Sequence, residues 1–234
     1  MFTETEYRER LKEYTDSDGL VCQKKVNQGE RGASGNGLLY TSIGMINLTR
    51  NRWLKESDVI YFRDVLLACS VPNYPYLFNR SPVKTDMNSH DDYTGIAAAF
   101  YEMGLDFMAA SLLKNFIKRS WHCDNETPEK PKLGAYLCRF PAFVNHIYNC
   151  ANQEAPKFTS TIAELGMRFA SYTTKKDDGD GWLLGYLRAF SSKSKESTLF
   201  INKLKSTFSD GGQGIVSRVL NEDLAHPLGL VFKI

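Results

Sequence analysis

The stretch Ser89–Phe100, SHDDYTGIAAAF, places a polar cluster directly before a run of small and apolar residues. Serine is favoured immediately before a helix, and the carboxylates of Asp91 and Asp92 suit the positive end of a helix dipole. The run that follows carries no charged residue, which is typical of a helix buried on all sides. This stretch therefore predicts an inner helix that begins near residue 90.

Helical spacing continues on both sides of this stretch. Val59, Phe62 and Leu66 recur every three to four residues behind Ser57, which we expect to cap their helix. Three further segments show the same amphipathic pattern: 104–121, 158–172 and 197–209. Connectors rich in proline or glycine separate these units, for example at 71–82 and 177–181. The chain is therefore predicted to be all-α.

The composition fits one domain. The chain has 234 residues, of which 42% are hydrophobic, and this is enough for one full core. We expect a single helical domain over 1–234, with an N-terminal helix and loop at 1–33 and an extended C-terminal tail at 222–234. The 29 basic and 27 acidic residues are scattered along the chain. This near-balance argues against a nucleic-acid-binding protein, which usually carries a clustered basic face.

Membrane, secretion and metal signals are weak. No segment approaches the about 18–20 consecutive apolar residues of a membrane-spanning helix, and the polar start Met1–Tyr14 has no apolar core of a signal peptide. The five cysteines form no CxxC pair, so we expect reduced thiols. His146 and Cys150 are four residues apart, but a zinc site needs more ligands. The segment 177–182, DDGDGW, lacks the spacing and final Glu of a calcium loop. We predict no metal and no cofactor.

Four polar segments precede apolar helices at similar intervals. Marked by Asn36, Asp91, Arg139 and Asp180, they are 55, 48 and 41 residues apart. Each interval leaves room for a helical hairpin, as in stacked or toroidal helix arrays. We expect the helices that follow these segments to form an inner layer, wrapped by the amphipathic ones. The spacing predicts an array of helical hairpins that forms a partial or small (α/α) toroid.

If the inner helices run parallel, the polar segments meet at one end of the molecule. Helix starts offer unpaired N–H groups and a positive dipole end. Carboxylates, aromatic rings and an arginine beside them suit a polar, ring-shaped ligand such as a sugar. The catalytic candidates are Asp91, Asp92 and Asp180. The candidate substrate-binding residues are Asn36, Tyr40, His90, Tyr93, Arg139, His146, Asp178 and Trp182.

Each polar segment also has a purely structural explanation. Ser89 and the aspartates after it are ordinary helix caps, and the glycines around Asn36 suit a tight turn. Pro141 fits the first position of a helix, and Arg139 then pairs with a neighbouring carboxylate. His146 is explained equally well as a core histidine. Four such segments at hairpin spacing favour a shared site, and both explanations stay open at this point.

Four blocks together resemble a set of uncharacterised helical proteins encoded by bacteriophages. The blocks are SGNGLLYTS (34–42), DDYTGIAAA (91–99), CRFPAFVNH (138–146) and DGDGWLLGYL (178–187). Their order and spacing agree with that set over about 34–187. The predicted architecture also resembles the (α/α) toroids of glycoside hydrolases and polysaccharide lyases, although the chain is short for six hairpins. The resemblance implies a protein of the infected host's cytoplasm or of the virion, and it carries over no catalytic residue.

Two functions of different classes follow. The first is a carbohydrate-active enzyme, a hydrolase or lyase acting on envelope glycan. Asp91 or Asp92 would be its acid/base, and Asp178 or Asp180 would be the partner about 5–10 Å away.

The second is a non-catalytic bacteriophage virion or accessory protein whose helical surface binds other phage structural proteins. Tyr74, Tyr76 and Phe78 in the connector 71–82, and the apolar end 226–234, are the features that favour it.

Overall fold

The computed structural model describes residues 3–32, 36–72, 74–83, 89–119, 121 and 133–208, without the side chains of 74, 75 and 133–140. Within these ranges the helices are α1 (Glu4–Glu13), α2 (Gly37–Arg50), α3 (Glu56–Ala68), α4 (His90–Glu102), α5 (Asp106–Lys118), α6 (Leu133–Cys150), α7 (Lys157–Thr173), α8 (Gly179–Ser191) and α9 (Lys195–Thr207). A small antiparallel sheet joins β1 (Ser70–Val71) to β2 (Tyr74–Phe78). The predominantly helical fold confirms the all-α prediction.

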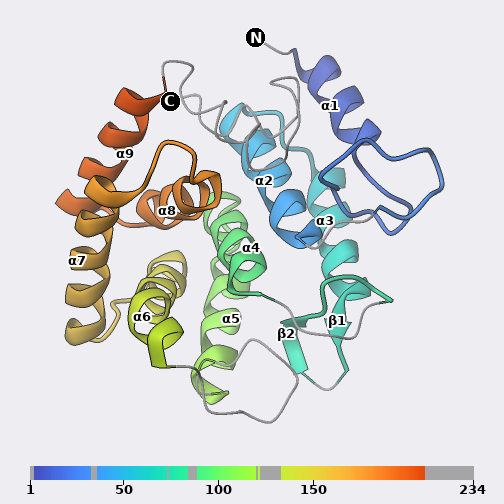
Figure 1. The fold of residues 1–234 in the computed structure, drawn as a ribbon. Coiled ribbons are helices and arrows are strands. Elements are labelled where there is room, and N and C mark those ends of the chain that lie inside the picture. Colours follow the sequence, from blue (N-terminus) through green and yellow to red (C-terminus); the bar gives the residue numbers. More distant parts are fainter. Residues whose placement is uncertain are drawn as a thin grey trace.

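The core is built around α4, which contacts α2, α5, α6 and α8 (Figure 1). Every residue from Gly37 to Leu48 in α2, and from Asp92 to Phe100 in α4, is buried. Gly95 lies at the closest approach, since a Cβ placed on it would lie 3.1 Å from the Leu39 Cα. The small residues of α2 and α4 therefore do what the sequence predicts, because they let two backbones pack closely inside the molecule.

The helices between these inner ones are amphipathic. In α5, Leu112 and Phe116 are buried while Phe107 and Ile117 face outward. The ring centroids of Phe116 and Tyr93 are 4.9 Å apart, so the end of α5 meets the start of α4. These two helices form an antiparallel hairpin, as the interval between polar segments predicts.

The connector at 71–82 contains a strand that the sequence analysis did not expect. Phe78 at the end of β2 is buried, and its backbone N–H donates a 3.0 Å hydrogen bond to the Tyr93 hydroxyl. The predicted cap of α3 is two residues out, because the helix begins at Glu56 rather than after Ser57. There the backbone N–H of Lys55 donates to a carboxylate oxygen of Asp58 in the first turn, at 2.8 Å.

α6 also differs from the prediction. The helix begins at Leu133, and Pro141 lies inside it rather than at its first turn. An interior proline removes one backbone hydrogen bond and disfavours the helical turn before it. Because proline is therefore rare inside helices, the sequence analysis placed a helix start at the polar segment 138–141. Arg139 therefore belongs to the interior of a helix, and its side chain lies outside the described residues.

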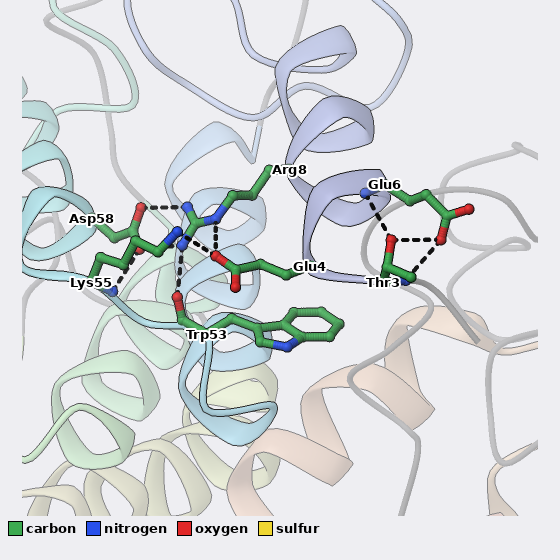
Figure 2. A network of polar contacts seen from close by, with 7 residues as sticks. All are labelled: Thr3, Glu4, Glu6, Arg8, Trp53, Lys55 and Asp58. Carbon is green, nitrogen blue, oxygen red and sulfur yellow. Dashed lines mark hydrogen bonds and ion pairs between the residues drawn. The ribbon is translucent and has the colours of Figure 1, made fainter.

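α1 is fixed to the start of α3 by a polar network (Figure 2). The Arg8 guanidinium donates to both carboxylate oxygens of Asp58, at 2.8 and 2.9 Å, and to the backbone carbonyl of Trp53. Glu4 accepts from Arg8 at 2.8 Å and pairs with Lys55 at 2.6 Å. Hydrogen bonds to charged groups contribute roughly 1.5–3 kcal/mol each when partly buried. The expected N-terminal helix is thus present as α1 and is attached to the segment at the start of α3.

The tail predicted at 222–234 lies outside the described residues. In the part of the chain that the structure describes, no helix has the length and apolar character needed to cross a membrane.

Candidate ligand-binding site at the helix starts

Asp92 joins the starts of α2 and α4. One carboxylate oxygen accepts a 3.0 Å hydrogen bond from the backbone N–H of Leu39, and the other accepts from the Ser89 hydroxyl at 3.2 Å. The residue before α2, Asn36, makes no capping hydrogen bond with its side chain. Since the first N–H groups of a helix have no partner within it, Asp92 supplies a cap to α2 from the neighbouring helix.

Burial makes the carboxyl group of Asp92 a weaker acid than an exposed aspartate. Its side chain has no exposed surface, and burial raises its pKa to about 6. Hydrogen bonds from Leu39 and Ser89, and the positive charge of Arg80, act in the opposite direction. Because solvent does not reach Asp92, its observed role is to hold two helix starts together.

α8 contacts α4, and the charge of Asp180 in its first turn acts on Tyr40 in α2. Tyr40, in the first turn of α2, is almost fully buried, and this burial is the main cause of a pKa raised to about 12. The Asn36 side chain hydrogen-bonds the Tyr40 hydroxyl and lowers the pKa, whereas the negative charges of Asp180, Asp92 and Asp91 raise it. Carboxylates from the first turns of α4 and α8 therefore act on one hydroxyl in α2.

The opposite ends of these helices also meet. Arg50, the last residue of α2, pairs with Glu102, the last residue of α4, at 3.2 Å. The same guanidinium donates to the Tyr186 hydroxyl in α8 and lies 3.6 Å from the centroid of the Phe190 ring. α2 and α4 thus begin together and end together, and α8 contacts the end of α2 through Tyr186 and Phe190.

α6 runs beside α4 in the same direction over its described half. The rings of His90 and Phe143 lie 4.6 Å apart, and the Thr94 carbonyl lies 3.0 Å from the Nε2 of His146. Moving one turn along α4 thus corresponds to moving one turn along α6. The half-buried His90 marks the point where α6 approaches the group of helix starts.

Besides Asp92 and Tyr40, the structure places three more of the candidate side chains in the core rather than at a surface. Tyr93 is buried between Phe78 and Phe116. Trp182 is buried against Phe200, and its indole N–H donates to the Lys175 carbonyl at 2.9 Å. Neither ring faces solvent. Their aromatic character serves packing at the positions where the sequence suggested sugar stacking.

His146 is the third of these side chains. Its Nδ1 lies 2.8 Å from the Ser191 hydroxyl, and burial lowers its pKa to about 4, with the backbone bond to Thr94 opposing. Cys150 lies 3.6 Å from its Nε2 and is itself fully buried. His146 is therefore a neutral core histidine that bridges α4, α6 and α8.

Five candidate side chains remain at or near the surface of the described chain. Asn36, His90 and Asp91 are half-buried, and Asp180 is exposed. Asp178 is exposed too, and it caps its own helix by accepting from the Gly181 N–H at 2.9 Å. The solvent-accessible carboxylates that belong to different helix starts are therefore Asp91 and Asp180.

Arg80 is a nearby residue that the sequence analysis missed. It follows β2, it is half-buried, and its positive charge acts on Asp92. The hydrophobic periodicity of the sequence does not single out Arg80, because it lies in a connector. Only the fold of the β1–β2 hairpin brings it close to Asp92. Among the side chains that the structure describes, Arg80 supplies a positive charge near Asp92. The side chain of Arg139, which the sequence predicted for this role, lies outside the described residues.

Two grooves lie elsewhere on the molecule. One, of about 650 Å³, runs between α3, the β1–β2 hairpin and α5, and Tyr76 and Leu67 are among its mostly apolar lining. The other, of about 920 Å³, lies beside Arg8 and Asp58 and has a mixed polar lining. Among the described residues, no group of three or more His, Cys, Asp or Glu is placed to hold a metal ion. Cys22, Cys69 and Cys150 are free, buried thiols.

Comparisons with known proteins return no family model that matches this chain, and no curated protein or solved structure that is significantly similar to it.

Proposed function

We propose that the end of the molecule where α2, α4 and α8 begin binds a polyhydroxylated ligand, a segment of an envelope glycan. The observation that carries the proposal is the meeting of three helix starts around Tyr40, joined by the hydrogen bond from the Leu39 N–H to Asp92. Clustered helix starts supply several N–H donors and positive dipole ends in one place. Accessible carboxylates next to them accept hydrogen bonds from vicinal hydroxyl groups.

The same arrangement suits glycoside cleavage. Asp91 is half-buried and Asp180 is exposed, so a ligand can reach both, whereas Asp92 is closed to it. In this proposal Asp91 is the acid/base and Asp180 the second carboxylate. Asn36 and Arg80 bind hydroxyl or carboxylate groups of the ligand, and His90 contributes a ring edge. Glycoside hydrolysis needs one proton donor and one carboxylate, and these two residues supply them from separate helices.

The partial (α/α) toroid belongs to this proposal. In it, α2, α4, α6 and α8 are the inner helices and α3, α5, α7 and α9 the outer ones. The buried lengths of α2 and α4 and the shared direction of α2, α4 and α6 support that arrangement. A bacteriophage protein that acts on the host envelope is the biological role that fits the sequence resemblance, and it is proposed here with the site.

A glycan array and a zymogram test the proposal together. The proteins are the wild type, Asp91→Asn, Asp180→Asn and the control Asp64→Asn, whose carboxylate is exposed on α3 beside Arg63. We expect the wild type and Asp64→Asn to bind the same glycan, and each site variant to bind at least about tenfold more weakly, as loss of a charged hydrogen bond predicts. Cleavage in the zymogram is expected to disappear in Asp91→Asn. Equal binding by all four proteins, or binding by none, would contradict the site.

The second candidate function is non-catalytic and acts through contacts with protein. The observation that favours it is the row of large apolar side chains exposed on α7. Isolated apolar residues on a surface are ordinary, whereas a continuous row is typical of an interface. In a phage protein such contacts would join it to other structural components. The array and the zymogram test the first candidate. The second is tested by whether a substitution in the exposed apolar row of α7 abolishes binding to another protein.

A further inference from the structure

The groove between α3, the β1–β2 hairpin and α5 is elongated, and we call it the α3 groove. Its lining follows α3 from Val59 to Leu67, and at 1.5 Å per residue these positions are about 12 Å apart along the helix axis. Ser70 and Val71 of β1 line it as well. Its volume of about 650 Å³ is within the range of small-ligand sites, roughly 300–1,000 Å³. The length and volume of the α3 groove therefore suit an extended small molecule.

The lining of the α3 groove is mostly apolar. Phe62, Leu66 and Phe78 are buried residues that line it, and Leu67 is 61% exposed, so part of this apolar surface is open to solvent. Met108 of α5 adds a flexible thioether, which adapts to the shape of an apolar ligand. The hydrocarbon core of a bilayer, about 30 Å thick, is two acyl chains deep, so one chain covers about 15 Å. A medium-chain acyl group therefore matches the groove in length and in polarity.

Arg63 supplies a positive charge to the α3 groove, and no acidic residue is among the described residues that line it. The Arg63 guanidinium pairs with Asp64 at 2.8 Å, but both side chains are more than half exposed, so this pair contributes little to stability. In the part of the chain that the structure describes, the Nη1 of Arg63 makes no hydrogen bond. The groove therefore offers a positive charge and N–H donors to an anionic group such as a carboxylate, which arginine binds with its planar fork.

Tyr76 gives the α3 groove a wall with an uncommon backbone conformation. Its φ angle is 63°, in the left-handed region that aromatic residues rarely adopt. Such conformations persist where the surrounding structure fixes them, and they are frequent at positions that contact ligands. Phe78 lines the groove too, as the alternation of side chains along a strand predicts. The strand β2 thus contributes two aromatic rings to the same groove.

We propose that the α3 groove binds a medium-chain fatty acid. The acyl chain lies along Phe62, Leu66 and Met108, and the carboxylate pairs with the exposed Arg63. The length of the groove selects the acyl chain, and the positive charge of its lining selects the acidic head group. Neither the proposed glycan site nor the exposed row of α7 uses these residues, so the inference goes beyond both candidate functions and is independent of them.

Isothermal titration calorimetry of the full chain with sodium decanoate, far below its micelle concentration, tests the proposal. We expect saturable binding at one site. Hexanoate lacks four of the methylene groups and should bind at least about tenfold more weakly, because each buried methylene contributes up to about fourfold. Decan-1-ol has the same chain without the charge and should bind roughly two- to fivefold more weakly, as loss of an exposed ion pair predicts. A wild type that binds none of the three overturns the site.

Two neighbouring substitutions test the location. Val59→Trp fills the groove and should weaken the binding of decanoate at least about tenfold. Ile60→Trp is the matched control, because Ile60 is the next residue of α3, is 42% exposed and is not among the residues that line the groove. This control should bind decanoate as the wild type does. Equal affinities of the two variants for decanoate would overturn the α3 groove as the site.

Arg63→Gln tests the head group. Arg63 is exposed, so this variant keeps the fold even if Val59→Trp does not. We expect the binding of decanoate to weaken roughly two- to fivefold and the binding of decan-1-ol to stay unchanged, so that the two probes bind equally well. If Arg63→Gln bound decanoate as the wild type does, or lost affinity for decan-1-ol to the same degree, the pairing of Arg63 with a carboxylate would be overturned.

Discussion

At the scale of a single residue, Asp92 makes a stabilising hydrogen bond, but its burial makes the charged carboxylate unfavourable. Its carboxylate caps α2 through the Leu39 N–H while burial opposes its ionisation. The pKa of Asp92 is raised from 3.8 to about 6 in the folded protein. Between these pH values the folded state holds a proton that the unfolded state releases. The contribution of Asp92 to stability is therefore highest in acid, and it falls by about 3 kcal/mol as pH rises through this window.

The variant Asp92→Asn separates the bond from the charge. Asparagine keeps an oxygen that can accept from the Leu39 N–H and has no proton to lose. We expect Asp92→Asn to unfold at a higher urea concentration than the wild type near pH 7. Its free energy of unfolding should exceed that of the wild type by up to about 3 kcal/mol at this pH and equal it near pH 4. Asp92→Ala leaves the buried N–H without this acceptor and should cost about 1–3 kcal/mol. If Asp92→Asn destabilised the protein as much as Asp92→Ala at neutral pH, the charge would be favourable and this reasoning would be wrong.

His146 gives the opposite pH dependence in an overlapping window. Its pKa is lowered from 6.5 to about 4, so between these pH values the unfolded chain binds a proton at His146 and the folded protein does not. Its contribution is fully present above about pH 6.5 and falls by about 3 kcal/mol towards pH 4. In the wild type these two slopes offset each other. Asp92→Asn should therefore reveal a loss of stability in acid that the wild type conceals, in the same urea titrations.

At the scale of secondary-structure elements, the contact between α2 and α4 depends on one glycine. A Cβ at Gly95 would lie 2.9 Å from the Leu39 Cδ1 and 3.1 Å from the Leu39 Cα. The side-chain atom can move, whereas the backbone atom moves only if the two helices separate. The buried polar bond from Leu39 to Asp92 lies one turn away along the same pair of helices.

Gly95→Ala is expected to destabilise the protein by about 1–3 kcal/mol, the usual cost of overpacking. Gly44→Ala is the matched control, since this glycine is also inside a buried helix and a Cβ there would meet the Leu11 Cδ1 at an ordinary 3.4 Å. The control should gain up to about 1 kcal/mol of helix propensity. Chemical denaturation of both variants measures the difference. Equal effects would show that the helices do not approach most closely at Gly95.

Local sequence predicted the character of most helices but missed two features of the connections. Small residues in α2 and α4 correctly predicted two helices that are buried along most of their length, and one-sided apolar spacing correctly predicted that α5 is buried on one side only. The position of Pro141 did not predict the start of α6, because an interior proline and a first-turn proline look the same without neighbours. The hairpin of β1 and β2 was missed because its strands are short and Phe78 is stabilised by tertiary contact with Tyr93.

At the scale of the whole molecule, the sequence predicted the buried character of α2 and α4 better than the role of each residue at the helix starts. Asp91 and Asp92 in the first turn of α4 and Asp180 in the first turn of α8 all act on the pKa of Tyr40, whereas the convergence of the four polar segments on one ligand site stays a prediction. Tyr93, Trp182 and His146 instead belong to the core. An aromatic ring or imidazole beside a polar segment carries no local sign of whether it faces inward, since burial depends on helices distant in sequence. Arg80 was missed for the same reason.

The central claim is that one ligand contacts three helix starts that are far apart in the sequence. Hydrogen–deuterium exchange of the full chain, with and without the best-binding glycan from the array, measures this most directly. We predict simultaneous slowing of exchange at 36–40, 89–93 and 178–182, because a ligand bound to Asn36, Asp91 and Asp180 suppresses the local opening of all three helix starts. Slowing confined to one of these segments, or to the groove between α3 and the β1–β2 hairpin, would contradict the account.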